Sequence, residues 1–145
     1  MELSPTAWRL CRHGVLLFFL GLVNGALVQA FANPRMGLSA HMAGVQNGLS
    51  LLVFGLLWPH ISFAARVERW AAVAGIASMW AIWIALLLAA IFGTSGATPI
   101  AGAGFAGAAW QEGIVTVLLY GGSVVLLAAV GFVLRAMGSG PARRP

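Results

Sequence analysis

The chain has 145 residues, of which 61% are hydrophobic and only 8% are charged, and it contains eight arginines but no lysine or aspartate. This composition is typical of an integral membrane protein. The arginines are scattered along the chain rather than gathered on one face, which argues against a nucleic-acid-binding protein despite the net charge of +5. Cys11 is the single cysteine, so an intramolecular disulfide is excluded.

Four apolar stretches lie near residues 14–32, 38–58, 70–92 and 113–134. As a helix, each is long enough to cross a hydrocarbon core of about 30 Å. The apolar residues run continuously instead of alternating with polar ones, which argues against a membrane β-barrel. Because the stretches use nearly the whole chain, we expect one membrane domain over residues 1–145 with an all-α, four-helix bundle fold.

The arginines also predict the topology of the bundle. Seven of the eight fall before the first stretch, between the second and third, or after the fourth, and only Arg35 lies in another loop. This bias places both termini in the cytoplasm. The first stretch could instead be a signal peptide, since Val28-Gln29-Ala30 resembles a cleavage site. We favour a retained helix, because its apolar run is longer than that of a typical signal peptide.

The first two stretches are separated by a very short link. Gly21-Leu22-Val23-Asn24-Gly25 repeats the G-x-x-N-G pattern of Gly44 to Gly48, which indicates that the two helices meet closely through small residues. We expect Asn24 and Asn47 to find partners across this contact. Pro34 and Gly37 are predicted to break the chain and form the turn, and Ser39 is the expected helix N-cap.

The second stretch, Leu38 to Trp58, carries no formal charge but contains His41 and Asn47. At about 100° per residue, the small and polar residues share an arc roughly 120° wide. They are Gly37, Ala40, His41, Gly44, Asn47, Gly48, Leu51 and Gly55.

Two readings stand for each feature of this face. The glycines allow the close approach of another helix or of a planar ligand. His41 is either a nitrogen ligand for iron, zinc or copper or a hydrogen-bonded structural histidine. We favour the functional role, because ionisable side chains are rare and costly at membrane depth. Asn47 on its own is equally consistent with a helix contact.

Polar and aromatic residues outside the second stretch are further candidates. Arg35 is a candidate partner for an anionic cofactor group or for a lipid phosphate. His13 is expected at the membrane interface, and Glu68 is expected to pair with a neighbouring arginine. Trp80 and Trp83 share a helix face, as core or lipid-facing residues or as an aromatic wall for a planar ligand.

The last stretch follows a loop, residues 93–111, that is rich in small residues and is predicted to be flexible and external. Glu112, Thr116, Tyr120 and Ser123 then form a polar stripe within about 80° of one helix, which should face protein rather than lipid. Glu112 is placed to pair with Arg35 or to act on a substrate proton.

Several short blocks stand out across the four stretches. They are Arg12-His13-Gly14, Phe31-Ala32-Asn33-Pro34-Arg35, Gly37-Leu38-Ser39-Ala40-His41, Asn47-Gly48 and Trp110-Gln111-Glu112. In these blocks the sequence resembles the bacterial hydroxylaminobenzene mutases, a family related to the styrene oxide isomerases. The resemblance implies a four-helix enzyme of the bacterial inner membrane that assembles as a homotrimer in the lipid bilayer and binds heme b between subunits.

The resemblance also implies roles for particular residues. His41 would be the axial ligand of the heme iron, and Asn47, six residues later, would be the catalytic group beside the substrate. Around that heme we expect Gly44, Gly48 and Arg35 as further cofactor contacts. Two positions depart from the styrene oxide isomerase pattern, because Leu86 stands where those enzymes have a tyrosine and Ile82 where an asparagine is usual.

These observations lead to one expected function and two alternatives. The expected function is an isomerase that rearranges hydroxylaminobenzene, an aryl hydroxylamine, to 2-aminophenol with heme iron as Lewis acid. The alternatives are an epoxide isomerase of the styrene oxide type and a noncatalytic membrane protein, such as a heme-binding electron carrier. A carrier usually has two axial ligands, whereas the spans hold one candidate histidine, which favours catalysis. The sequence has no Ser-His-Asp set, phosphate loop or cysteine cluster, so hydrolase and nucleotide-binding functions have no support.

Overall fold

The computed structural model describes residues 3–138. They form four long helices, α1 (Pro5–Ala26), α2 (Pro34–Leu57), α3 (Ala65–Phe92) and α4 (Ala109–Met137), with short 3-10 helices η1 (Val28–Ala30) and η2 (Trp58–His60) after the first two. Within this part of the chain there is no strand. The all-α prediction is therefore confirmed, and all four helices are long and apolar enough to cross a membrane.

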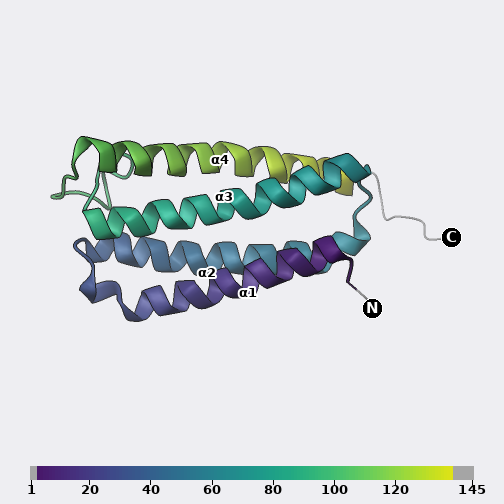
Figure 1. Ribbon diagram of the computed structural model, residues 1–145, viewed down its shortest axis with the longest axis horizontal. Coiled ribbons are helices and arrows are strands. Elements are labelled where there is room, and N and C mark those ends of the chain that lie inside the picture. Colours follow the sequence, from purple (N-terminus) through teal and green to yellow (C-terminus); the bar gives the residue numbers. More distant parts are fainter. Residues whose placement is uncertain (1–2, 139–145) are drawn as a thin grey trace.

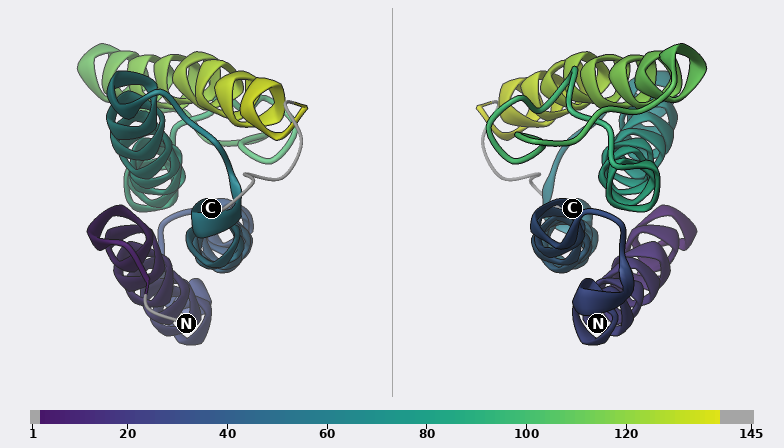
Figure 2. Two further views of the ribbon diagram at one scale, coloured as in Figure 1. Left: turned by 90° about the vertical axis from the view of Figure 1, so that its right-hand side faces the viewer. Right: turned by 90° about the vertical axis from the view of Figure 1, so that its left-hand side faces the viewer.

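The helices pair as two hairpins rather than as a closed square. α1 packs along α2 and α3 along α4, and the hairpins meet mainly through α2 and α3 (Figure 1). Among the described helices, α4 packs against α3 alone, and the end views show it inclined across α3 on the side away from α1 and α2 (Figure 2). α1 begins and α4 ends at the same end of the molecule (Figure 1). That this end faces the cytoplasm stays a prediction.

The predicted link between the first two helices is wrong in its details. α1 ends at Ala26, and α2 begins at Pro34, because Asn33 caps it: its side-chain oxygen accepts hydrogen bonds from the backbone N–H of Arg35 and Met36. Proline is favoured in the first turn, where its missing N–H costs nothing. Gly37 therefore lies inside α2, and Ser39, the expected cap, donates its hydroxyl to the Arg35 carbonyl one turn earlier.

The contact between α1 and α2 is built on glycines, as predicted. A Cβ atom added at Gly48 would lie 2.5 Å from the Phe18 nitrogen and 2.8 Å from the Gly14 oxygen. One added at Gly21 would lie 2.7 Å from the Val45 nitrogen. Real Cβ atoms essentially never come so close, so the backbones approach to a distance that only glycine permits.

The connection between α3 and α4 is an ordered loop rather than an unrestrained one. Gly93 ends α3 in the left-handed conformation, with φ of 68°. Glu112, in the first turn of α4, accepts hydrogen bonds from the backbone N–H groups of Ser95, Gly96 and Gly107 at 2.8–3.0 Å. Three charge-assisted bonds from one carboxylate hold both ends of the loop against α4.

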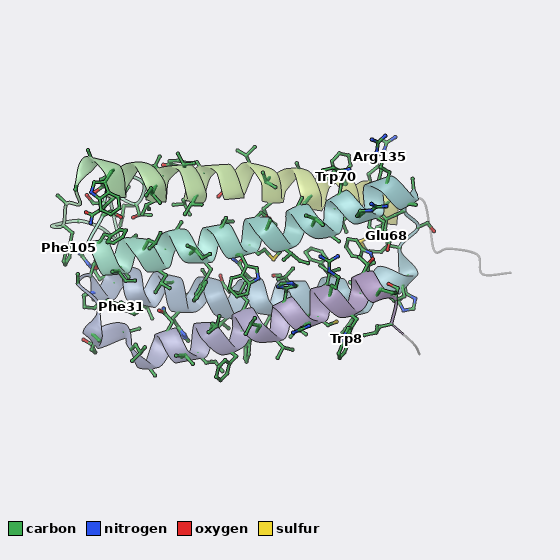
Figure 3. The ribbon with its side chains drawn as sticks, viewed as in Figure 1. Trp8, Phe31, Glu68, Trp70, Phe105 and Arg135 are labelled. Atoms are coloured by element: carbon green, nitrogen blue, oxygen red, sulfur yellow. The ribbon has the colours of Figure 1, made fainter. Side chains whose placement is uncertain are left out.

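The same loop is fastened to the start of α2. The Asn33 side chain donates to the Ala101 carbonyl, and its backbone N–H donates to the Ala90 carbonyl of α3. Arg35 donates to the Ala103 carbonyl, and its guanidinium lies 5.9 Å from the centre of the Phe105 ring. Phe31 and Phe105 mark this end of the molecule in Figure 3. The predicted pairing of Arg35 with Glu112 is wrong, because each binds backbone groups of the loop instead.

Two smaller predictions also need correction. Glu68 accepts a hydrogen bond from the Trp58 indole at 3.1 Å, and among the described residues it forms no ion pair with its neighbouring arginines. This contact ties the start of α3 to the end of α2. His13 is not simply interfacial, because its Nδ1 is buried and its ring lies edge-on to Trp80, with centroids 6.3 Å apart.

Candidate functional site

The imidazole of His41 is fixed in position by α1. Its Nδ1 lies 2.8 Å from the backbone carbonyl oxygen of Gly21. A carbonyl oxygen only accepts hydrogen bonds, so Nδ1 is the donor in this contact and Nε2 is the ring nitrogen left for another partner. None of the described residues hydrogen-bonds to Nε2. His41 is therefore an imidazole oriented through Nδ1, with Nε2 available, which is the arrangement typical of metal-binding histidines.

The room for this ring comes from Gly25. A Cβ atom at Gly25 would lie 2.5 Å from His41 Nδ1 and 2.8 Å from Cε1, so any side chain there would displace the imidazole. The sequence analysis missed the part that Gly21 and Gly25 play in holding His41. The repeated G-x-x-N-G pattern could have indicated this role, because it occurs once in each of the two helices that form the contact.

Asn47 faces a different helix. Its amide nitrogen donates to the backbone carbonyl of Met79 in α3 at 3.1 Å, so the predicted partner across the α1–α2 contact is wrong for Asn47. The prediction is right for Asn24, which donates to the Gly37 carbonyl of α2 at 3.0 Å. The Met79 contact orients the Asn47 amide and leaves its carbonyl oxygen without a hydrogen bond from any described residue. That oxygen is a fixed acceptor in an apolar setting.

Gly44 and Gly48 pack against neighbouring helices of the same chain. Gly44 lies against the Gly21 backbone and the Trp83 indole, and Gly48 lies against Phe18 and Gly14. Both are buried. Their contact with a cofactor stays a prediction, as does that of Arg35, whose guanidinium already binds the loop between α3 and α4.

The two tryptophans of α3 form part of the interior. The indole of Trp83 is 8% exposed, and its ring meets Trp80 edge-on, with centroids 5.6 Å apart and planes at 88°. Both indole N–H groups are buried and have no hydrogen-bond partner among the described residues. Edge-on rings offer such groups an N–H to π contact, which compensates part of their desolvation. The core reading of Trp80 and Trp83 is thus favoured over an aromatic wall for a ligand.

Two side chains of the polar stripe on α4, those nearest the start of the helix, bind the loop between α3 and α4. Besides Glu112, Tyr120 donates to the Ala97 carbonyl at 3.5 Å, while Ser123 bonds back to its own helix through the Leu119 carbonyl. Glu112 thus faces the loop as expected, whereas the Tyr120 side chain is 55% exposed and only its hydroxyl reaches the loop. Glu112 is occupied by three backbone donors, which leaves it poorly placed to act on a substrate proton.

A metal at His41 would need ligands beyond this chain's own side chains. Across residues 3–138, no three His, Cys, Asp or Glu side chains gather where they could hold an ion. Heme would fit this situation, because the porphyrin itself supplies four nitrogen ligands to the iron and few are needed from the protein. The His41 imidazole, held through Nδ1 and with Nε2 available, could supply such a ligand.

Comparison with known proteins gives a consistent assignment. The family model described as "Styrene oxide isomerase" matches residues 6–138. Hydroxylaminobenzene mutase HabB of Ectopseudomonas oleovorans is 41% identical over 142 residues, which cover 97% of this chain and 87% of that protein. Hydroxylaminobenzene mutase HabA of the same organism is 37% identical over 111 residues, covering 74% of this chain and 80% of HabA. The chain therefore belongs to the styrene oxide isomerase family and is an enzyme of the isomerase class.

Proposed function

We propose that this protein is a membrane mutase that rearranges hydroxylaminobenzene to 2-aminophenol, with heme b held by His41. The observation that carries the proposal is the orientation of His41: the Gly21 carbonyl fixes the ring through Nδ1, and Nε2 has no hydrogen-bond partner among the described residues. The identity of 41% with HabB over 97% of the chain supports the aryl hydroxylamine as substrate. The four membrane-length helices support a multi-pass protein, and we assign it to the bacterial inner membrane.

The rearrangement suits what these residues offer. The reaction leaves the overall oxidation state unchanged: the N–O bond breaks, and oxygen is bonded to the ring in the product. When bound at His41, heme iron would supply a Lewis acid that polarises the N–O bond. The protein would hold that group through His41, surround it with apolar helix surface that excludes water, and orient the substrate through few polar atoms.

Asn47 is the proposed orienting group. Its carbonyl oxygen can accept a hydrogen bond from the hydroxyl or N–H of the hydroxylamine, because the amide nitrogen is already committed to Met79. A fixed acceptor of this kind favours one orientation of the substrate before the reaction begins. Its effect should therefore appear in the rate rather than in the binding of the cofactor.

We further propose that the active assembly is a homotrimer with sites shared between copies. His41 and Asn47 are six residues apart and so point about 120° away from each other on α2. In this chain, His41 contacts α1 and Asn47 contacts α3, on opposite flanks of the glycine strip. A site that uses both side chains is thus more easily completed by a second copy than within one chain. The number three comes from the resemblance to the styrene oxide isomerases.

Epoxide isomerisation is the second candidate, favoured by the family model. Against it stand the two positions where this chain departs from those enzymes. Ile82 packs against Gly122 of α4, and Leu86 packs in the apolar cluster around Met36 and Ala89. Both side chains contribute packing rather than polar groups, so the helix-three tyrosine and asparagine of an epoxide isomerase have no counterparts here.

The test is a comparison of substrates. The purified protein would be incubated in detergent with hydroxylaminobenzene and, separately, with styrene oxide, and products would be separated by chromatography. We expect 2-aminophenol from the first and little conversion of the second. Fast conversion of styrene oxide without 2-aminophenol would replace the mutase with the epoxide isomerase, and heme without turnover of either would favour a carrier.

A further inference from the structure

An apolar cavity lies between α3 and α4, near the end where α1 begins and α4 ends. Its volume is about 470 Å³, within the range of roughly 300–1,000 Å³ typical of ligand sites. Its walls include Trp70 and Ala74 from α3 and Val124, Ala128 and Phe132 from α4. Trp70 is 67% exposed and Phe132 is 52% exposed, so the cavity is open along the side of the bundle. In a membrane, that side faces lipid or another protein.

A second cavity of about 240 Å³ adjoins the first and shares Val67 and Phe132 with it. It is lined by Ser62, Ala64 and Arg135 and lies at the start of α3. Arg66 stands at the larger cavity. Figure 3 shows Trp70 and Arg135 at this end, on the side of the molecule away from α1 and α2. We call the larger, apolar cavity the slot and the smaller, more polar cavity, with Arg66 and Arg135 beside it, the mouth.

Two arginines give this mouth its charge. In the part of the chain that the structure describes, neither Arg66 nor Arg135 forms an ion pair, and Glu68 turns instead to Trp58. The start of α3 has no side-chain cap, because its N-cap residue is Ala64; its first turn carries one acid, Glu68, beside Arg66 and Arg69. An anionic group would find two guanidinium ions and an uncapped helix end here.

We propose that the groove between α3 and α4 binds an anionic phospholipid, with an acyl chain in the larger cavity and the phosphate at Arg66 and Arg135. Basic pockets between membrane helices are recognised sites for anionic headgroups. A long apolar slot that opens sideways suits an acyl chain, which needs no polar partner along its length. The slot suits the aromatic hydroxylamine less well, because its walls offer no acceptor to orient the polar group.

The test measures lipid binding to the intact protein by native mass spectrometry after addition of equal amounts of phosphatidylglycerol and phosphatidylcholine. We expect adducts mainly with phosphatidylglycerol. Since one arginine near a lipid surface changes affinity by about fivefold, Arg66→Gln with Arg135→Gln should reduce the preference by roughly 25-fold. The matched control is Arg9→Gln, a cation of α1 that lines neither cavity and should leave the preference unchanged.

A second variant tests the slot without touching the charges. Ala128→Phe should fill the larger cavity and reduce phosphatidylglycerol binding, whereas Val117→Phe, at a 70% exposed position elsewhere on α4, should not. Equal binding of the two lipids by the unaltered protein would overturn the proposal. So would an unchanged preference in the arginine double variant. Loss of the oligomer in Ala128→Phe, with lipid binding intact, would identify the groove as an interface between copies and likewise refute the lipid site.

Discussion

Replacing Gly48 with alanine should destabilise the α1–α2 hairpin, because this glycine lies where two backbones touch. The added Cβ would lie 2.5 Å from the Phe18 nitrogen, 2.7 Å from its Cα and 2.8 Å from the Gly14 oxygen, whereas ordinary contacts begin at 3.4 Å. Backbone atoms cannot swing aside as a side chain can, so α1 must shift by roughly 1 Å. Overpacking of this kind costs about 1–3 kcal/mol.

The control is Gly121→Ala on α4, where an added Cβ meets nothing within 4 Å. That variant should keep or slightly raise stability, by up to about 1 kcal/mol, because alanine favours helix over glycine. The assay is unfolding of each purified variant by increasing amounts of sodium dodecyl sulfate in mixed micelles, followed by circular dichroism. Gly48→Ala should unfold at a clearly lower detergent fraction than Gly121→Ala. Coincident unfolding curves would refute the close backbone contact between α1 and α2.

Three further predictions address the site and the loop. Gly25→Ala should push the His41 imidazole away from the Gly21 carbonyl and weaken heme binding by about 10–100-fold in a heme titration. The control is Gly113→Ala, where an added Cβ meets nothing within 4 Å, and equal heme affinities of the two variants would contradict the role of Gly25. Asn47→Ala should lose only about 0.6 kcal/mol of stability and retain heme, because it removes one hydrogen bond between helices. The variant should nevertheless turn over hydroxylaminobenzene more slowly, and an unchanged rate would show that Asn47 only packs α2 against α3. Glu112→Gln should speed amide hydrogen exchange at Ser95 and Gly107 about tenfold, which corresponds to a loss of roughly 1.4 kcal/mol. The control is Glu68→Gln at the other end of the molecule. Unchanged exchange in Glu112→Gln would show that the Glu112 carboxylate does not order the loop.

The second helix shows how far its sequence predicts the site. Helical periodicity placed Gly44, Gly48 and Gly55 on one face, and the structure buries that face against α1. Periodicity gives an angle around the helix, however, and does not say which neighbour lies there. Asn47 was therefore correctly placed beside the glycines but assigned to the wrong helix, since α3 rather than α1 covers its flank.

Short polar motifs were harder to interpret than apolar ones. Asn33-Pro34 is equally typical of a turn and of a helix start, and only the hydrogen bonds from Arg35 and Met36 to the Asn33 side chain decide for the helix start. The loop after α3 reads as flexible because its residues are small and have weak preferences. Its order comes from Glu112 and Arg35, whose partners are backbone groups that carry no sequence signal.

The most direct test of the account is the absorption spectrum of the detergent-purified protein and of His41→Gly, each recorded with and without added imidazole. The account predicts a heme band in the unaltered protein, loss of that band in His41→Gly, and its return when free imidazole takes the place left by the side chain. Insertion into the membrane should be unaffected, because it depends on the apolar length of the helices. An identical heme band in His41→Gly without imidazole would contradict the assignment of His41 as the axial ligand.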